Sequence, residues 1–435
     1  MSRRDFLTGT AAAAAFMIVP RSVLGGSGST PPSDRLNIAA IGFGGMGRNN
    51  IASLTSENIV ALCDVDDGYA AEVFETYPDA ERYRDFRRLL ENEKGVDAVV
   101  IATPDHTHAV IAMMAIQLGK HVFCQKPLTH TVYEARKLAE AAHEAGIASQ
   151  MGNQGHAGEG NRLICEWIWD GAIGPVREVH TWTNRPIWPQ GIPRPKESPP
   201  TPATIDWDLW LGPAPFRPYH PAYAPFKWRG WGDFGTGALG DMGCHIIDSP
   251  FWALKLSHPT GVEASSTPLN EETYPHAAVV RYSFPARDEK PPVKLTWYSG
   301  GLLPPRPEEL EEGRRMGDSG GGVIFVGDRG KLMCGTYGLN PRLIPETKMQ
   351  EYTLPPKTIP RVQGIHEEWI EACKGGKEAS SNFSISGPLT EMVLLGNIAI
   401  KTGQKLQWDG EKMEIMNVPD ANELVHREYR DGWTL

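Results

Sequence analysis

A glycine-rich turn between a strand-like run and a helix-like segment constrains this chain more than any other feature. The apolar run Leu36–Ile41 is followed directly by the sequence GFGGMG at Gly42–Gly47. In such a spacing the first glycine permits a tight turn, the second lets backbone approach a pyrophosphate, and the third lets the helix pack closely on the strand. The helix N-terminus also stabilises phosphate charge. The turn therefore predicts a dinucleotide site formed by Gly42, Phe43, Gly44, Gly45, Met46 and Gly47.

Strand-like runs and segments with helical spacing alternate through the first part of the chain. Between the strand-like runs, the helical periodicity is clearest at His108–Leu118 and Val132–Ala145. This alternation predicts a parallel sheet covered by helices on both faces. The fold class expected here is an α/β Rossmann domain. The strand-like runs are Leu36–Ile41, Asn58–Asp64, Val96–Ala102, His121–Gln125 and Ile147–Met151.

An acidic residue ends the second strand-like run, where dinucleotide-binding domains place the group that contacts a ribose. Asp64 stands at this position. Its carboxylate would accept hydrogen bonds from the ribose hydroxyls and would repel a 2′-phosphate. Because glycine clusters in turns are often only structural, the interpretation depends on the combination with Asp64. The sequence thus predicts an NAD site and disfavours NADP.

Polar residues follow the next two strand-like runs, at the edge where a doubly wound sheet binds its ligands. The segment Thr103–His108 (TPDHTH) comes after the third run, and Gln125-Lys126-Pro127 follows the fourth. Lys126 is expected to contact a nicotinamide ribose or a substrate oxygen, although its position alone fits a solvated surface lysine equally well. The additional cofactor-binding residues predicted here are Thr103, Pro104, His108, Gln125 and Lys126.

Taken in order, these motifs resemble the glucose-fructose oxidoreductase, inositol dehydrogenase and rhizopine-catabolism (Gfo/Idh/MocA) family. The match includes the Gly-Lys-His-Val run at Gly119–Val122 and extends from about Leu36 to Trp408. The family's usual Glu-Lys-Pro reads Gln-Lys-Pro at Gln125–Pro127, so an amide replaces the carboxylate while the lysine is kept. The resemblance implies an N-terminal Rossmann domain followed by an α+β domain with a large, open-faced, mostly antiparallel sheet.

The family carries an Asp and a His four residues apart on a helix near the nicotinamide. Gly240–Asp248 (GDMGCHIID) offers Asp241 and His245 at this spacing. Residues four apart share one face of a helix, so both side chains can reach one cleft. By spacing alone such a pair is more often a surface or capping arrangement. The resemblance implies His245 as general base, Asp241 as its partner or a substrate ligand, and Lys126 as an electrostatic and positioning group.

Other polar and aromatic residues are candidates for substrate contact. Six tryptophans cluster in the second domain; aromatic faces suit sugar rings, although large aromatics more often belong to a core. One or two of the six are expected to touch substrate. The run Asn153–His156 (NQGH) either lines the cleft or forms an interdomain hinge. The substrate candidates are Asn153, Gln154, His156, Trp231 and Asp248, and the six tryptophans are Trp182, Trp188, Trp207, Trp210, Trp228 and Trp231.

Later strand-like runs predict the second sheet, and late helices at Gln363–Cys373 and Pro388–Thr402 are expected to pack near the first domain. In the family this open sheet commonly forms a homo-oligomer interface, which implies a homodimer or homotetramer. The predicted organisation is a signal and linker at 1–32, the NAD(P)-binding Rossmann domain at 33–152, the substrate-binding and oligomerisation domain at 153–410, and a tail at 411–435. The strand-like runs are Val176–Thr183, His276–Phe284, Val293–Ser299 and Val323–Gly327.

The first residues have the composition of an export signal. Two adjacent arginines, Arg3 and Arg4, precede Phe6 and Leu7, an Ala-rich apolar run and a Gly/Ser/Pro linker. A charged segment, a short apolar segment and small residues predict a cleaved signal rather than a membrane helix. The paired arginines favour the twin-arginine route over general secretion. The protein is therefore expected in the periplasm, without a membrane span in its mature form.

Charge and cysteine content disfavour other partners and cofactors. A formal charge of −10 leaves no basic surplus to neutralise nucleic-acid phosphates. Six cysteines in 435 residues do not make a disulfide framework, and no pair has metal-ligand spacing. We therefore expect free thiols and no metal. Cys63 and Cys124 fall in strand-like runs, where a thiol usually acts as a small buried hydrophobe.

The expected activity is hydride transfer between a sugar or cyclitol hydroxyl and tightly held NAD. Outside the cytoplasm no pool of free NAD is maintained, so the cofactor would be loaded before export and regenerated within each cycle. A ping-pong oxidoreductase ranks first. A redox-neutral NAD-dependent glycosidase, working by oxidation, elimination, hydration and reduction, is the alternative. A non-catalytic NAD-binding sugar sensor is the third, and the presence of Lys126, Asp241 and His245 speaks against it.

Overall fold

The structure, a computed structural model, describes residues 34–435 and begins with a six-stranded parallel sheet. Its strand order is β3-β2-β1-β4-β5-β6, so the order reverses between β1 and β4 and leaves a crevice for ligands at that point. The five predicted strands are confirmed to within two residues at each end. The strands are β1 (Asn37–Ile41), β2 (Asn58–Cys63), β3 (Glu81–Tyr83), β4 (Ala98–Ile101), β5 (His121–Cys124) and β6 (Ser149–Met151).

Some of the helices that cover this sheet begin at a side-chain cap. The side chain of Asp66 caps α3, and Thr131 with Glu134 forms a capping box at the start of α6. Gly146, with a φ of +63°, ends α6 in the left-handed conformation. The predicted helices at 108–118 and 132–145 are both present. The helices are α2 (Met46–Ala52), α3 (Asp67–Thr76), α4 (Phe86–Asn92), α5 (Asp105–Gln117) and α6 (Val132–Ala145).

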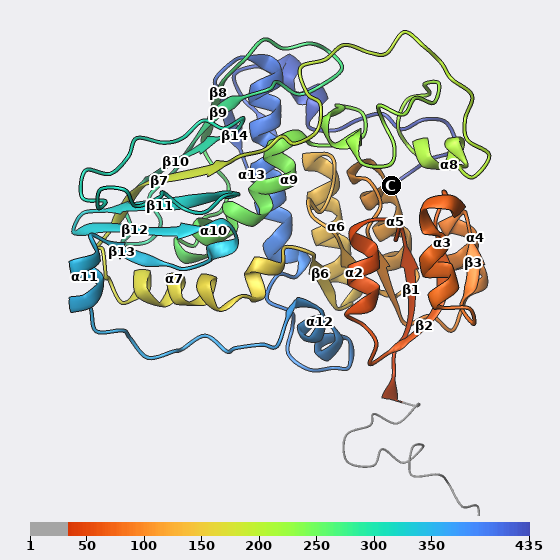
Figure 1. Ribbon diagram of the computed structural model, residues 1–435, viewed down its shortest axis with the longest axis horizontal. Helices are drawn as coiled ribbons and strands as arrows, with labels where there is room; N and C mark the ends of the chain where they lie inside the picture. Colours follow the sequence, from red (N-terminus) through yellow and green to blue (C-terminus); the bar gives the residue numbers. More distant parts are fainter. Residues whose placement is uncertain (1–33) are drawn as a thin grey trace, which may run out of the picture.

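A nine-stranded sheet of order β13-β12-β11-β7-β10-β9-β8-β14-β15 forms the second domain (Figure 1). All its pairings are antiparallel except that between β7 and β10. The expected mostly antiparallel sheet is thus confirmed. The strands are β7 (Val176–Thr183), β8 (Gly261–Ser266), β9 (Ala278–Phe284), β10 (Val293–Tyr298), β11 (Gly321–Gly327), β12 (Gly330–Gly335), β13 (Arg342–Ile344), β14 (Leu406–Asp409) and β15 (Glu414–Ile415).

A long apolar helix, α13, joins the two domains through their interior. Arg136 on α6 donates to Glu391 on α13 at 2.7 Å, so the helix is anchored to the first domain as predicted. The helix is long and apolar enough to cross a membrane, but 83% of the relevant window is buried inside the protein, which is what a core helix shows. The helices of this half are α7 (Glu159–Trp169), α8 (Trp207–Leu211), α9 (Gly237–Ile246), α10 (Asp248–Ala253), α11 (Glu346–Glu351), α12 (Ile365–Cys373) and α13 (Phe383–Thr402).

The last residues lie across the first domain, and the C-terminus ends near α5 and α8 (Figure 1). Arg427 pairs with Glu134 at 3.0 Å, and the guanidinium of Arg87 lies 4.5 Å from the ring centroid of Trp433. Residues 411–435, which were predicted to be a tail, therefore pack against the first domain. Trp433 in this segment lines the cavity of the candidate site.

Candidate functional site

Backbone geometry shows why three positions of the glycine turn are glycine. Gly42 follows β1 with a φ of +78°, a conformation that L side chains rarely adopt. A Cβ on Gly47 would lie 2.1 Å from the carbonyl oxygen of Gly42, so only glycine lets α2 start this close to the turn. A Cβ on Gly44 would lie 1.9 Å from the ring of Tyr69, which packs on this glycine. Gly42 is required by its backbone conformation, and Gly44 and Gly47 by the lack of space for a Cβ.

Asp64 holds the glycine turn from the end of β2. Its Oδ2 accepts a hydrogen bond from the backbone N–H of Phe43 at 2.9 Å, and its Oδ1 accepts from that of Asp66 at 3.0 Å. Burial raises the pKa of Asp64 to about 6, against the lowering effect of these amide hydrogen bonds. Each carboxylate oxygen can accept more than one hydrogen bond, so Asp64 can still receive a ribose hydroxyl.

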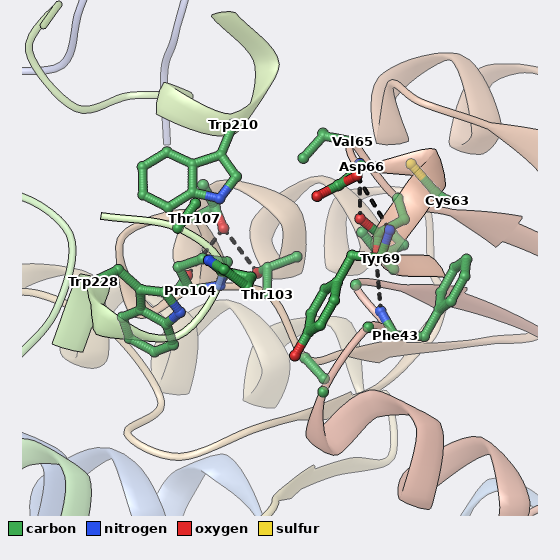
Figure 2. A pocket seen from close by; sticks show the side chains of 18 of the residues that line it. Phe43, Cys63, Val65, Asp66, Tyr69, Thr103, Pro104, Thr107, Trp210 and Trp228 are labelled. Atoms are coloured by element: carbon green, nitrogen blue, oxygen red, sulfur yellow. Dashed lines mark hydrogen bonds between the residues drawn. The ribbon is translucent and has the colours of Figure 1, made fainter. Parts of the chain in front are cut away.

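A cavity of about 360 Å³ is lined by the glycine turn, Asp64 and Lys126. Figure 2 shows Trp210 and Trp228 on one side and Phe43, Asp66 and Tyr69 on the other. A glycine turn, an acidic strand end and aromatic walls fit a dinucleotide at this crevice. The cofactor residues predicted from sequence that line the cavity are Gly42, Phe43, Gly44, Gly45, Met46, Asp64, Thr103, Pro104, Gln125 and Lys126.

Lys126 joins the two domains beside this cavity. Its Nζ donates to both Oδ1 and the carbonyl oxygen of Asp241 on α9, each at 2.8 Å. The Nε of Arg229 lies 3.3 Å from the same Oδ1. Burial alone would raise the pKa of Asp241, but the charges of Lys126 and Arg229 outweigh it and lower that pKa to about 2. Asp241 is therefore ionised at neutral pH and holds two cations.

His245, one turn further along α9, is 3% exposed and lies edge-on to Tyr337, with ring centroids 4.8 Å apart. Its Nδ1 has no hydrogen-bond partner among residues 34–435. Burial and the charge of Lys126 hold the pKa of His245 well below its usual value, and Asp241 offsets only part of this. The sequence predicted His245 as general base, with Asp241 as its partner or a substrate ligand. The structure instead gives the Asp241 carboxylate to Lys126 and Arg229, and His245 stays neutral.

A second buried carboxyl group, not singled out from the sequence, lies at the same place. Asp105 opens α5, is 4% exposed and lines the cavity. Its Oδ2 accepts from the Thr236 hydroxyl at 2.6 Å, and burial raises its pKa. Thr236 immediately precedes α9, so the first domain contacts the start of the helix that carries Asp241 and His245.

Several predicted site residues do not line the cavity, although Asp241 bonds Lys126, which does. His108 is 1% exposed, and its ring nitrogens lie 2.9 Å from the carbonyl oxygens of Thr103 and Pro127. It therefore braces the two loops instead of contacting cofactor. Gly47 acts through packing, as described above. The predicted residues outside the lining are Gly47, His108, Asn153, Gln154, His156, Trp231, Asp241, His245 and Asp248.

The candidate substrate residues after the first domain are mostly structural. Trp231 is completely buried, and its indole N–H donates to the Ala222 carbonyl at 2.8 Å. The Nδ1 of His156 donates to Oδ1 of Asp248 at 2.8 Å, and the ring stacks on Trp252 with centroids 4.2 Å apart. Asn153 is buried as well and accepts from Ser381, whereas Gln154 is exposed. The run at 153–156 thus matches the interdomain alternative better than the cleft-lining one.

Of the six tryptophans, Trp210 and Trp228 line the cavity. The guanidinium of Arg229 lies 4.2 Å from the ring centroid of Trp228, so the second cation on Asp241 is held against an aromatic wall. Periodicity carried no signal for Arg229, because it lies in a single turn of 3-10 helix, Lys227–Gly230. Cavity residues that sequence reasoning missed include Asp66, Tyr69, Arg84, Asp105, Phe226, Arg229 and Trp433.

Fold and site together define a two-domain, NAD-binding Rossmann protein with an open second sheet. Two family models match it: "Oxidoreductase family, NAD-binding Rossmann fold" over residues 36–153 and "Oxidoreductase family, C-terminal alpha/beta domain" over residues 184–282. The chain belongs to this family, the Gfo/Idh/MocA oxidoreductases. The resemblance inferred from the motifs is thereby confirmed.

Relatives of known activity match part of the chain. Inositol 2-dehydrogenase of Salmonella typhimurium is 30% identical over 151 residues, which is 33% of this chain and 45% of the relative. Levoglucosan dehydrogenase of Pseudarthrobacter phenanthrenivorans is 25% identical over 225 residues, covering 49% of this chain and 50% of the relative. The matches thus span about half the length of these curated relatives.

Solved structures share the fold over most of the chain. An inositol dehydrogenase homolog from Azotobacter vinelandii, complexed with NADH and myo-inositol, superposes with a TM-score of 0.56 at 18% identity, covering 86% of this chain and 98% of its own. The WlbA dehydrogenase from Bordetella pertussis, complexed with NADH and UDP-GlcNAcA, gives 0.60 at 17% identity, covering 86% and 99%. At these identities the likeness establishes the fold.

Proposed function

We propose that this protein is an exported NAD-dependent oxidoreductase that transfers hydride between a sugar or cyclitol hydroxyl carbon and tightly held NAD. The observation that carries the proposal is the bond from Lys126 of the dinucleotide domain to Asp241 of the second domain, one turn from His245. This arrangement places a cation on the cavity lining, a carboxylate that holds it, and a neutral imidazole one turn further along α9. The inositol and levoglucosan dehydrogenases among the relatives support a polyhydroxylated substrate.

NAD, when bound, accepts a hydride from the substrate carbon. The residues of the chain then have to remove the hydroxyl proton and stabilise the oxygen that loses it. His245 is neutral, so it can take up that proton through a free nitrogen lone pair. The Lys126 ammonium, held in place by Asp241, is the group suited to stabilise the developing negative charge on the oxygen.

Asp64 and the glycine turn are proposed to hold the adenosine half of NAD. The ionised carboxylate would accept from ribose hydroxyls and repel a 2′-phosphate, which favours NAD over NADP. The twin-arginine signal proposed for residues 1–32 lies outside the described residues, and export rests on its sequence alone. A homodimer or homotetramer assembled through the nine-stranded sheet is likewise proposed, and sedimentation of the mature protein tests it.

The first experiment adds nitrophenyl glycosides and, separately, free sugars and cyclitols to the protein as purified, without added cofactor. Reduced-nicotinamide absorbance on adding a free sugar or cyclitol, lost in His245→Ala, supports the oxidoreductase. Nitrophenol release that is lost in the same variant would replace it by a redox-neutral glycosidase. If bound nicotinamide stays unchanged with every saccharide, the protein is a sensor and the proposal fails.

A further inference from the structure

A second cavity, of about 310 Å³, lies behind the segment that leads into α9. One face of α13 lines it with Leu394, Asn397, Ile398 and Lys401, which have the i, i+3, i+4, i+7 spacing of a single helical face. Neither the sequence motifs nor the proposed function accounts for this cavity. Its volume is at the lower end of the range of roughly 300–1,000 Å³ found for small-molecule sites. The rest of the lining comes from the start of α6, from loops around Asp233 and Tyr274, and from the C-terminal segment 423–428.

Two buried hydrogen-bond acceptors on this lining have no donor. The Nε2 of His130 lies 3.1 Å from the Gly235 carbonyl oxygen and must donate to it, so Nδ1 carries the lone pair of the neutral ring. Asn397 donates from Nδ2 to the Thr236 carbonyl at 2.8 Å, which identifies Oδ1 as its acceptor. Neither His130 Nδ1 nor Asn397 Oδ1 has a partner within residues 34–435. Leaving each without a donor costs about 1–3 kcal/mol.

Protonation of Nδ1 does not readily remove the unpartnered lone pair of His130. Burial and the charges of Arg427 and Lys401 hold the pKa of His130 well below its usual value. Asn397 is only 4% exposed, so bulk water does not freely reach it. Both atoms are covered by the residues around them. A ligand that displaces this cover from the cavity side and donates hydrogen bonds to these atoms would remove both penalties.

Charge on the lining argues against a charged ligand. Arg427 is engaged with Glu134, and Asp233 with Arg217. Lys401 is left without a salt bridge in the described chain; its Nζ lies 5.4 Å from the Tyr274 ring centroid. Glu423 and Glu428 also lack a salt-bridge partner there. An anion would meet the two carboxylates and a cation would meet Lys401, so the arrangement favours a neutral ligand.

Hydroxyl groups meet all of these requirements, because each can donate one hydrogen bond and accept others. They can donate to His130 Nδ1, Asn397 Oδ1 and the carboxylates, and accept from Lys401. The apolar side chains of Leu394, Ile398 and Leu424 suit the C–H surface of a sugar ring. We propose that this cavity is a second binding site for a small neutral polyol, separate from the cavity of the glycine turn.

The position of this second site connects it to the first. His130 and Asn397 bond the carbonyl groups of Gly235 and Thr236, the two residues before α9. From the other side, Asp105 of the first cavity accepts from the Thr236 hydroxyl. A polyol in the second cavity would therefore contact the residues that fix the start of α9.

The test is methyl NMR on the full mature chain, titrated with myo-inositol and with D-glucose as neutral probes and with D-gluconate as the acidic one. We expect the methyl resonances of Ile398, Leu394 and Leu424 to shift with the neutral probes. Ile111 and Leu209, which line the first cavity, report binding there separately. Failure of the proposed oxidoreductase activity would leave the Ile398 shifts unaffected, so the two proposals are judged independently.

Two variants localise the site, each with a matched control. Lys401→Met keeps the apolar stem and removes the ammonium, and it should raise the Kd seen at Ile398 at least about tenfold. Lys377→Met, at an exposed lysine outside the cavity, should leave that Kd unchanged. Leu424→Trp should fill the cavity and abolish the shifts, while Leu118→Trp at a similarly exposed leucine should not.

Three outcomes would overturn the proposal. Shifts confined to Ile111 and Leu209 would mean that polyols bind only in the first cavity. No shifts with either neutral probe at high concentration would mean that water fills the second one. Tighter binding of D-gluconate than of D-glucose at Ile398 would mean that the site selects an anion and that the charge argument is wrong.

Discussion

The Lys126 ammonium and the Asp241 carboxylate are 115 residues apart in sequence and 2.8 Å apart in space. One belongs to the loop after β5 and the other to α9, so the bond ties the dinucleotide domain to the second domain at the rim of the cavity. Because the pKa of Asp241 is lowered to about 2, its carboxylate stays charged, and the Lys126–Asp241 ion pair persists across the physiological pH range. The Lys126–Asp241 contact thus fixes both the position of the second domain against the first and the position of the Lys126 charge.

Replacing Lys126 should separate these two roles. Lys126→Met removes the ammonium and leaves Asp241 paired with Arg229 alone, so turnover should fall by about 10²–10³, the effect of losing one donor to a developing oxyanion. Lys126→Arg should recover part of the activity. NAD affinity, measured by nicotinamide fluorescence, should change much less. Equal losses of turnover and of NAD affinity in both variants would show that Lys126 serves cofactor binding only.

His245 should affect stability and activity at different pH values. Its folded-state pKa is below the unfolded value of about 6.5, so below pH 6.5 the unfolded chain takes up a proton that folded His245 does not. The stability that neutral His245 contributes is therefore present above pH 6.5 and is lost as pH falls, by up to about 1.4 kcal/mol per pH unit. Urea unfolding between pH 7 and 5 should show a shallower loss in His245→Gln than in the wild type.

The pH dependence of wild-type activity should also reflect the lowered pKa of His245. If His245 is the base, kcat/KM should have no inflection near pH 6.5 that His245 could explain, and hydride transfer should be lost in His245→Gln while NAD binding remains. Lys126→Met and His245→Gln should not be additive, because both act on one hydroxyl group. A wild-type inflection of kcat/KM near pH 6.5 that persists in Lys126→Met and in variants of the other histidines would contradict the burial argument.

Much of the fold could be predicted because local patterns specify it. The glycine turn, the apolar strand-like runs and the helical spacing at Val132–Ala145 are all patterns within short segments. β3 was missed because Glu81–Tyr83 is a largely exposed edge strand without an apolar period. The role of Arg229 was missed because it depends on contacts with Asp241 and Trp228 that only the folded chain brings together. His108 was predicted to bind cofactor because of its position after a strand. In the structure both of its ring nitrogens lie against backbone carbonyl oxygens.

Asp64 should make NAD binding depend on pH. Burial raises its pKa to about 6, so the carboxylate that accepts from ribose hydroxyls is ionised only above that pH. The affinity for NAD should therefore rise between pH 5 and pH 7, and the preference for NAD over NADP should widen over the same interval. Asp64→Asn should flatten both trends, as measured by calorimetric titration. A wild-type NAD affinity that is constant from pH 5 to 7 would rule out this role for Asp64.

Trp228 and Trp231 allow a matched comparison between a tryptophan that lines the cavity and one that belongs to the core. Trp231 is completely buried, so Trp231→Ala should lower the free energy of unfolding by about 3–5 kcal/mol, with little change in ligand affinity of the protein that remains folded. Trp228 lines the cavity and supports Arg229, and Trp228→Ala should weaken ligand binding beyond its effect on stability. Urea unfolding and titration with NAD and a substrate sugar measure the two effects. Equal affinity losses in both variants would mean that the aromatic cluster acts only by holding the loops, and that Trp228 contacts no ligand.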